Sequence, residues 1–359
     1  MFKFLGALVT IAVAVGLLVL AWPQFFGFQD SFLIAQAVAL RGALVVAGLV
    51  ALVLCLLLAL ARPMRAFAGT LAVLFALFTV ANVAIIGVRG ITGTEGTAAP
   101  AASDAPATDT PADANATAAN GQDITVLSWN TLGDAPGSDR IAQLAIESRA
   151  NVIVLPETTE ATGVEVALQM RAAGLPMWVK TVAFDQISPA RSTTLLISPS
   201  LGDYDTVTSN ENRAENTAVL PTVIATPSDG VGPTIVAAHA VSPSQAQMQN
   251  WRTDLQWLAR QCASDDVIMA GDFNATIDHM AGLGTGDGTT LGQCTDAASS
   301  AGAAGLGTWP TDAPALLGSP IDHVMAGSKW TVTGMRVVTD LDGTGSDHRP
   351  VVATLSPAS

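Results

Sequence analysis

The chain has 359 residues, of which 50% are hydrophobic and only 13% are charged, and its mean hydropathy is +0.43. This composition excludes a fully disordered chain, a collagen-like repeat and a small disulfide-rich protein. It indicates that part of the chain is embedded in a lipid membrane. The 30 acidic and 16 basic residues give a net charge of −14. That charge argues against an electrostatic polyanion binder, because nucleic-acid affinity depends largely on Lys and Arg.

Three long uncharged segments at the N-terminus each predict a membrane-spanning helix. Their apolar cores are residues 4–22, 43–61 and 67–88, and each offers roughly the 20 residues that a helix needs to cross a bilayer. Three stretches without a polar face fit poorly as buried helices of a soluble domain. The first is also longer than the apolar region of a cleavable signal peptide. We therefore predict a multi-pass anchor in the cell membrane over residues 1–92, with membrane lipid as its partner.

Basic residues in the short loops predict the orientation of this anchor. Lys3 precedes the first segment, and Arg62 and Arg65 separate the second from the third, so these ends are expected on the cytoplasmic side. Arg41 and Arg89, at the opposite ends, weaken this assignment. The remainder of the chain is accordingly expected outside the cytoplasm.

A segment of small and polar residues follows the anchor. Residues 95–122 hold 11 Ala together with Thr, Pro, Asp and Gly, and no Val, Ile, Leu or aromatic residue. Such a segment cannot bury a core. We predict that residues 93–122 form a disordered tether that spans on the order of 30 Å and holds the next domain just clear of the lipid headgroups.

Residues 123–359 are long enough to form one domain with a large core. Five basic residues and one acidic residue lie before position 93, which leaves 11 basic and 29 acidic residues for the rest of the chain, a net charge of −18. Short apolar runs between Gly- and Pro-rich loops predict a strand-rich domain. The expected strands are residues 124–128, 152–155, 194–197, 219–225, 234–238, 267–270, 321–325, 331–338 and 351–355.

Two helices are expected among these strands, so the domain should consist of layered sheet and helices. One covers about residues 138–149, and the other begins at Ser242–Pro243, an N-cap followed by Pro at the first helical position. The second helix carries a core-facing stripe whose last member is Cys262. Cys262 and Cys294 either form a disulfide in an oxidising compartment or remain two buried free thiols.

Polar and ionisable residues stand where several of the predicted strands end. They are Asn130, Glu157 and His239, followed by the segments Gly271-Asp272-Phe273-Asn274-Ala275-Thr276, Ile321-Asp322-His323-Val324 and Gly345-Ser346-Asp347-His348-Arg349-Pro350. Carboxylates and imidazoles are costly to bury unpaired, so this pattern indicates one shared polar pocket around a cation. Asp322 and His323 must face opposite sides of an extended strand, so only one of them can reach that pocket. Asp278 and His279 are expected on the surface, and Trp309 is expected to pack.

The motifs GDFNAT, IDHV and SDHRPV, in this order and at this spacing, resemble the endonuclease/exonuclease/phosphatase superfamily, which includes deoxyribonuclease I, exonuclease III, inositol polyphosphate 5-phosphatases and neutral sphingomyelinases. The resemblance covers about residues 123–356 and is greatest to bacterial members with N-terminal membrane helices. It implies a four-layer α/β sandwich, in which two packed mixed sheets are flanked by helices, here preceded by three transmembrane helices. His323 then packs, because the resemblance gives the catalytic position to Asp322.

The resemblance also implies a metal site. Glu157, with Asn130 beside it and Asp347 as a further carboxylate, would hold a divalent ion. The usual ion is Mg²⁺, with Mn²⁺ as the alternative. Hard oxygen ligands suit Mg²⁺, which keeps several of its waters and so needs few protein ligands. No Cys/His cluster in the sequence has the spacing of a zinc site.

The catalytic roles follow from the same resemblance. Asp272 would orient or deprotonate an attacking water, and Asn274 would donate to a phosphate oxygen. His348, oriented by Asp322, would act as a base or as a phosphate clamp. His239 would contact the phosphate from the opposite side and protonate the leaving group. Together these groups would act by positioning and charge neutralisation at an in-line phosphoryl centre.

We therefore expect a membrane-anchored, Mg²⁺-dependent hydrolase of phosphodiesters or phosphomonoesters. Its substrate is a small molecule, a lipid headgroup or nucleic acid, although the chain lacks the basic runs that track a nucleic-acid backbone. No protein partner can be inferred. The alternative is a catalytically silent binding or sensor module on the same fold. A transporter is disfavoured, because the predicted spans carry no internal charge that would mark a pathway.

Overall fold

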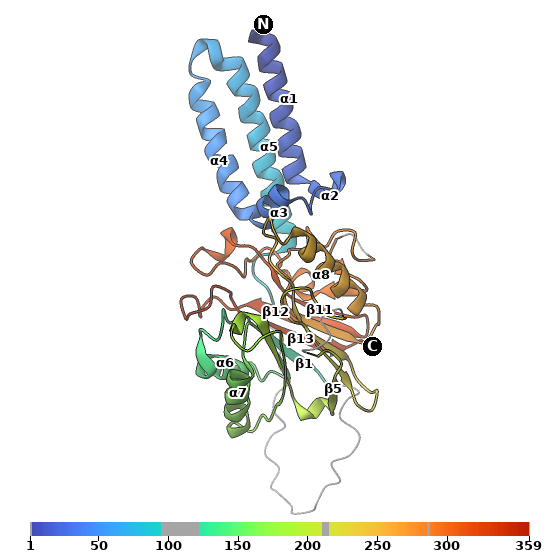
Figure 1. Ribbon diagram of the computed structural model, residues 1–359. Helices are drawn as coiled ribbons and strands as arrows, with labels where there is room; N and C mark the ends of the chain where they lie inside the picture. Colours follow the sequence, from blue (N-terminus) through green and yellow to red (C-terminus); the bar gives the residue numbers. More distant parts are fainter. Residues whose placement is uncertain (1, 95–121, 210–214, 286–287, 359) are drawn as a thin grey trace, which may run out of the picture.

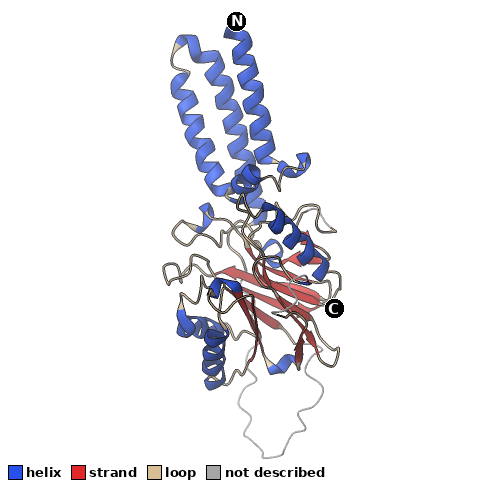
Figure 2. Cartoon of the chain, in the orientation of Figure 1, coloured by secondary structure: helices blue, strands red, loops and turns tan. Residues whose placement is uncertain are grey.

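The computed structural model describes residues 2–94, 122–209, 215–285 and 288–358 (Figure 1). Almost all of the predicted tether, residues 95–121, lies outside the described residues. A bundle of three long helices stands at one end of an α/β domain, and Figure 2 shows that the strands are confined to that domain. The division of the chain at residues 92 and 122 stays a prediction.

The helical bundle consists of α1 (Phe2–Ala21), α4 (Arg41–Leu58) and α5 (Arg65–Arg89). All three are long and apolar enough to cross a membrane. Two short helices, α2 (Pro23–Phe26) and α3 (Phe32–Ala39), connect α1 to α4 and lie between the bundle and the α/β domain (Figure 1). The sequence did not predict these two helices.

The α/β domain contains two mixed sheets. The first has the strand order β12-β13-β1-β2-β4-β3, and the second has the order β5-β6-β7-β8-β11-β10-β9. The strands of the first sheet are β1 (Ile124–Ser128), β2 (Val152–Pro156), β3 (Trp178–Ala183), β4 (Ser192–Ile197), β12 (Trp330–Val337) and β13 (Val351–Pro357). Those of the second are β5 (Tyr204–Thr206), β6 (Val223–Pro227), β7 (Thr234–His239), β8 (Val267–Asp272), β9 (Thr290–Leu291), β10 (Cys294–Asp296) and β11 (Asp322–Ala326). Among the strands of the described residues, only the pairs β1–β2 and β7–β8 are parallel.

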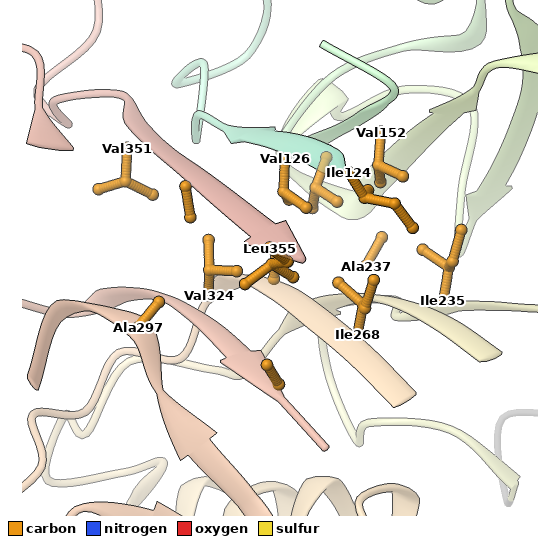
Figure 3. Close-up of a cluster of buried hydrophobic side chains, with 14 of the residues drawn as sticks. Ile124, Val126, Val152, Ile235, Ala237, Ile268, Ala297, Val324, Val351 and Leu355 are labelled. Carbon is orange, nitrogen blue, oxygen red and sulfur yellow. The ribbon is translucent and has the colours of Figure 1, made fainter. Parts of the chain in front are cut away.

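Three buried layers hold the sandwich together. Between the sheets, aliphatic side chains such as Val126, Ile268 and Leu355 form one cluster (Figure 3). A second cluster lies where α6 (Gly137–Glu147) and α7 (Glu160–Ala172) cover the outer face of the first sheet. The third lies between the second sheet and α8 (Met248–Gln261). Two mixed sheets flanked by helices confirm the predicted four-layer sandwich.

Several element boundaries differ from the sequence-based predictions. The strands β3, β5, β9 and β10 were not predicted, because β3 is half exposed and the other three have only two or three residues. The helix expected at Ser242–Pro243 begins at Met248, so its predicted start is wrong. Cys262 follows this helix and is joined to Cys294 of β10 by a disulfide, which decides between the two alternatives for these thiols.

The helical bundle packs directly against the α/β domain. After α5, the amides of Thr92 and Gly93 donate to the carbonyl of Gly302, and Thr94 pairs with Met335 of β12. Contact with the α/β domain therefore begins within a few residues of the bundle.

Asp278 and His279, expected on the surface, are also buried, each only 1% exposed. The Asp278 carboxylate accepts hydrogen bonds at 2.7 to 2.9 Å from two guanidiniums, those of Arg41 and Arg89. We call these three residues the Asp278 cluster. Burial alone would raise the pKa of Asp278, but Arg89 and Arg41 outweigh this effect and hold that pKa below its usual range.

Candidate active site

The predicted strand-end residues meet because of how the strands are paired. The parallel strands β1 and β2 end at the same edge of the first sheet, and β7 and β8 end together in the second. The antiparallel strands β13 and β11 start at those edges. In the second sheet, Asp272 is the register partner of both His239 and Asp322. Because the two sheets pack face to face, all eight predicted site residues lie at one end of the sandwich.

Asp272, Asp322 and His348 form the buried centre of the site. Asp322 Oδ2 lies 2.9 Å from His348 Nδ1, and Asp272 Oδ2 lies 3.8 Å from His348 Nε2. One ligand atom from each of the three lies within 4.8 Å of the other two. An Asp-bonded imidazole has a fixed ring orientation, so the Nε2 edge of His348 faces Asp272.

The electrostatics of this centre depend on burial and on the close carboxylates. Burial raises the pKa of Asp272 to about 7, with His348 opposing the rise and Asp322 adding to it. Burial alone would lower the pKa of His348, but the Asp322 and Asp272 carboxylates raise it to about 10. A buried carboxyl with a pKa near neutrality can accept a proton at physiological pH.

Asp272 is held in one orientation by its neighbours. Its carboxylate accepts hydrogen bonds from the amide N of Asn274 at 2.8 Å, from Asn274 Nδ2 at 3.1 Å and from Asn130 Nδ2 at 3.0 Å. Asn274 Nδ2 also donates to the carbonyl of Ala240, so in this structure Asn274 orients Asp272. Before Asp272, Gly271 has φ +144°, and a Cβ there would lie 1.9 Å from the carbonyl oxygen of Ala238. Only glycine fits this position between β8 and β7.

Glu157 lies beside this centre in an uncommon backbone conformation. Its φ of +57° is in the left-handed region, which costs a non-glycine residue of order 1–3 kcal/mol and is concentrated at functional sites. Asn130 Nδ2 donates to Glu157 Oε1 at 3.1 Å. Burial raises the pKa of Glu157, with the Asn130 hydrogen bond opposing the rise. The site therefore holds a carboxylate that gains from a nearby cation.

His239 is fully buried on the other side of Glu157. Its Nε2 lies 3.8 Å from Glu157 Oε1 and has no hydrogen-bond partner, and its Nδ1 lies 3.5 Å from the Thr193 hydroxyl. Burial, together with the charge of His348, lowers the pKa of His239 to about 3. This imidazole is neutral at physiological pH, which suits hydrogen bonding better than proton donation to a leaving group.

Asp347 is held by a residue that the sequence assigned to packing. Trp309 Nε1 donates to Asp347 Oδ2 at 2.8 Å, whereas Asp347 Oδ1 has no hydrogen-bond partner. Asp347 Oδ1 lies 4.0 Å from His348 Nε2. Trp309 therefore orients a site carboxylate. Its only sequence signal was its place in a Thr-Trp-Pro segment before the Asp322 strand.

Two other motif residues lie away from the site. His323 points to the far side of β11, where Nδ1 lies 2.9 Å from Asp296 Oδ1 and Nε2 lies 2.8 Å from the Ala275 carbonyl. The opposite facing of Asp322 and His323 is therefore confirmed. Arg349 is 1% exposed, and it donates to Asp342 and to several backbone carbonyls, so it is not available to a substrate.

A pocket of about 300 Å³ opens over these groups. Its polar lining includes Glu157, Asp272, Asn274, Asp347 and His348. Asn130, His239 and Asp322 lie behind this lining and do not border the pocket. The pocket is also lined by four residues at α3 and its C-cap, Ala35, Gln36, Ala39 and Leu40, which the sequence did not connect with the site.

The donor set suits a hard divalent cation. Glu157 and Asp347 present carboxylates to one pocket, and the unpartnered Asp347 Oδ1 and raised Glu157 pKa both favour a positive charge between them. The buried Asp272, Asp322 and His348 provide a second set of possible ligands. Asp322 is also hydrogen bonded to His348, so the same set is suited to acid–base chemistry as well.

Comparison with known proteins agrees with this geometry. The sequence profile of the Endonuclease/Exonuclease/phosphatase family matches residues 127–348, a span that contains all eight predicted site residues. The chain belongs to this family. Members with this fold include phosphoester hydrolases and nucleases. No curated protein sequence matches this chain.

Solved structures of this fold are similar to the α/β domain. A humanized TDP2 from D. rerio is 18% identical, with a TM-score of 0.50, and the alignment covers 65% of this chain and 98% of that one. An endonuclease/exonuclease/phosphatase from Beutenbergia cavernae is 18% identical, with a TM-score of 0.48, covering 66% and 72% of the two chains. One from Bacteroides vulgatus is 13% identical, with a TM-score of 0.46, covering 66% and 100%. At these identities only the fold is shared.

Proposed function

We propose that this protein is a metal-dependent phosphoester hydrolase anchored in the cell membrane by α1, α4 and α5. One observation carries the proposal. A single pocket is lined by Glu157, Asp272, Asp347 and His348, and Asp322 orients His348 from behind that lining. Family membership supports the reaction class.

The metal site of the proposal is built from oxygen ligands. Glu157 and Asp347 would hold the ion, with Asn130 beside them fixing Glu157 through Nδ2 and Trp309 fixing Asp347. When bound, Mg²⁺, or Mn²⁺ in its place, polarises the phosphoryl group and offsets its charge. The orienting hydrogen bonds matter because loss of a group that orients a metal ligand typically costs about 10- to 100-fold in metal affinity.

The remaining residues position and deprotonate the attacking water. Asp272 takes one proton from the water as its oxygen bonds to phosphorus, and Asn274 keeps Asp272 in place. The bond between phosphorus and the leaving oxygen breaks on the opposite side, and that oxygen takes up a proton from solvent. His348, oriented by Asp322, donates a hydrogen bond to a phosphate oxygen. The neutral His239 does not border the pocket and acts from behind it, where its Nε2 lies 3.8 Å from Glu157 Oε1.

Activity of the full chain in detergent micelles tests this proposal. We expect hydrolysis of bis-(p-nitrophenyl) phosphate that is lost with a chelator and restored by Mg²⁺ or Mn²⁺. Asp205→Asn is a suitable control, because Asp205 is exposed on β5, away from the site. A folded chain that is inert with every divalent ion would contradict the proposal and favour a silent binding or sensor module.

The bundle supports an extracytoplasmic position for the α/β domain. Arg62 and Arg65 lie in the turn between α4 and α5, at the end of the bundle far from the domain (Figure 1). Arg41 and Arg89 lie at the near end, paired with Asp278, and are outnumbered by Lys3, Arg62 and Arg65 in the rule that places basic residues in the cytoplasm. The disulfide is consistent with an oxidising compartment. Protease treatment of intact cells should remove the domain. Protection in intact cells, with cleavage only after lysis, would reverse the orientation.

A further inference from the structure

We propose that α3 is one wall of the substrate-binding site, and that the substrate is a phosphoester carried by a lipid of the membrane that holds the bundle. This inference rests on the proposed function and names its substrate class. Its first basis is that Ala35, Gln36, Ala39 and Leu40 line the same pocket as Glu157, Asp272 and His348.

The four α3 residues form one face of the helix. The pairs 35 and 39, 36 and 39, and 36 and 40 are three or four positions apart, the spacing of neighbours on a helical surface. Leu33, which is 76% exposed, and Ala37, on the side of the helix opposite Ala39, are not part of the pocket lining. One face of α3 therefore borders the site, while Leu33 faces the surroundings and Val38 is buried.

The α/β domain holds α3 firmly in this position. Ala35 and Val38 are each 1% exposed. His279 Nε2 lies 3.1 Å from the Ala35 carbonyl, and Gln36 Nε2 donates to the Pro243 carbonyl at 2.7 Å. Directly after α3, Arg41 joins the Asp278 cluster. Because of these contacts, α3 has a fixed position beside the site.

The pocket lies at the level of the lipid headgroups. Leu40 lines the pocket, and Arg41 is the first residue of the second candidate span. That span has 18 residues, which at about 1.5 Å per residue gives about 27 Å, close to the roughly 30 Å of a bilayer core. A lipid phosphate at the membrane surface would therefore reach the site without leaving the bilayer.

Exposed apolar side chains are also found in the segment between α1 and α4, at the expected level of the lipid headgroups. Between α1 and α4, Trp22 is 63% exposed, Phe25 76%, Phe28 47% and Leu33 76%. Aromatic rings at a membrane–water interface sit among the headgroups, whereas a water-exposed cluster of this kind is uncommon on a soluble surface. The α2–α3 segment is thus suited to lie in the interface and bring the pocket to it.

The pocket has both a polar and an apolar lining. Glu157, Asp272 and His348 line it together with apolar residues that include Leu40 and Leu220. A phosphoester with an apolar chain matches this division, because its phosphate meets the carboxylate site and its chain meets α3.

The charge of the pocket disfavours a long nucleic acid. Among the described residues that line it there is no Lys or Arg. The nearby Arg41 and Arg89 are occupied by Asp278, and Arg252 donates to the Asp30 carbonyl. Backbone-tracking proteins need free cations along a groove, and this site offers none in the part of the chain that the structure describes.

The test compares three substrates with full-length protein reconstituted in phosphatidylcholine vesicles that contain phosphatidylglycerol. The substrates are the vesicle phosphatidylglycerol, the water-soluble diester glycerophosphoglycerol, and plasmid DNA. We expect kcat/KM for the vesicle lipid to exceed that for the soluble diester by on the order of tenfold or more, since apolar contacts add binding energy. DNA should not be cleaved at a comparable rate.

A pair of matched variants tests the wall. Ala39→Trp fills the pocket side of α3 and should lower lipid turnover by on the order of tenfold or more, because added volume in a packed site is costly. Ala37→Trp places the same ring on the opposite face and should leave turnover unchanged. Equal lipid turnover by Ala39→Trp and wild type would overturn the role of α3.

The outcomes separate this inference from the proposed function. If the protein hydrolyses bis-(p-nitrophenyl) phosphate but prefers the soluble diester or DNA, the lipid inference fails and the proposed function stands. If it hydrolyses none of these substrates with any divalent ion, the proposed function fails as well.

Discussion

Replacing Asp278 with Asn tests how the helical bundle is held on the α/β domain. The substitution keeps the side-chain size but removes the negative charge that Arg41 and Arg89 share through four hydrogen bonds of 2.7 to 2.9 Å. Arg41 is only 5% exposed, so its guanidinium would stay buried without a counter-ion. Breaking a buried ion pair in this way costs about 3–5 kcal/mol. We therefore expect the contact between α3 and the domain to open far more often.

Hydrogen–deuterium exchange of the full chain in micelles measures this opening. Since about 1.4 kcal/mol corresponds to a factor of ten, the backbone amides of α3 should exchange on the order of 100-fold faster or more in Asp278→Asn. Asp205→Asn, an exposed change on β5, is the matched control and should exchange as wild type does. Equal α3 protection in Asp278→Asn and Asp205→Asn would refute this account of the interface.

The same cluster predicts a pH dependence with a definite sign. Because the pKa of Asp278 is lower in the folded state than the unfolded value of about 3.9, its stabilising effect is fully present above that value and is lost as the pH falls below it. The difference in unfolding temperature between wild type and Asp278→Asn should therefore be constant from neutral pH to about pH 5 and should shrink in stronger acid. A difference that shrinks between pH 8 and 6 would contradict the assignment.

Three further predictions follow from single contacts. Asp322→Asn removes the carboxylate that orients His348, the imidazole of the proposed active site, and should lower kcat by on the order of 100-fold or more with little change in KM; a kcat within a few-fold of wild type would argue against the pair. Trp309→Phe removes the hydrogen bond to Asp347 and should raise the Mg²⁺ concentration for half-maximal activity by about 10- to 100-fold, whereas an unchanged metal titration would count against Asp347 as a ligand. Reducing the Cys262–Cys294 bond, whose cysteines are 32 positions apart, should destabilise the domain by about 2–4 kcal/mol. Identical thermal unfolding with and without reductant would show that the bond does not contribute.

The site residues that could be predicted from the sequence are those that stand at the ends of predicted strands. An apolar run followed directly by Asp272, or by Glu157, shows where a chain leaves the core, and parallel or antiparallel pairing then fixes which ends share an edge. The opposite facing of Asp322 and His323 likewise needs only the two-residue repeat of a strand. These inferences depend on local geometry, which the sequence carries.

Contacts between distant segments could not be predicted in this way. Asp278 looked like a solvated loop residue because its partners, Arg41 and Arg89, are 237 and 189 positions away. The role of α3 was hidden for the same reason, since eight mostly apolar residues between two predicted spans give no sign that one face borders a pocket. The edge strand β3 was missed because it is half exposed and its pattern resembles a loop.

The most direct test of the central claim is Mg²⁺-dependent hydrolysis of bis-(p-nitrophenyl) phosphate by the full chain in micelles, measured for wild type and for two variants in the buried centre. Asp272→Asn removes the carboxylate proposed to accept the water proton, and His348→Ala removes the imidazole held by Asp322. We predict that each variant loses on the order of 10³-fold in kcat while its thermal unfolding remains cooperative. Folded variants that retain wild-type activity would contradict the assignment of this pocket as the active site.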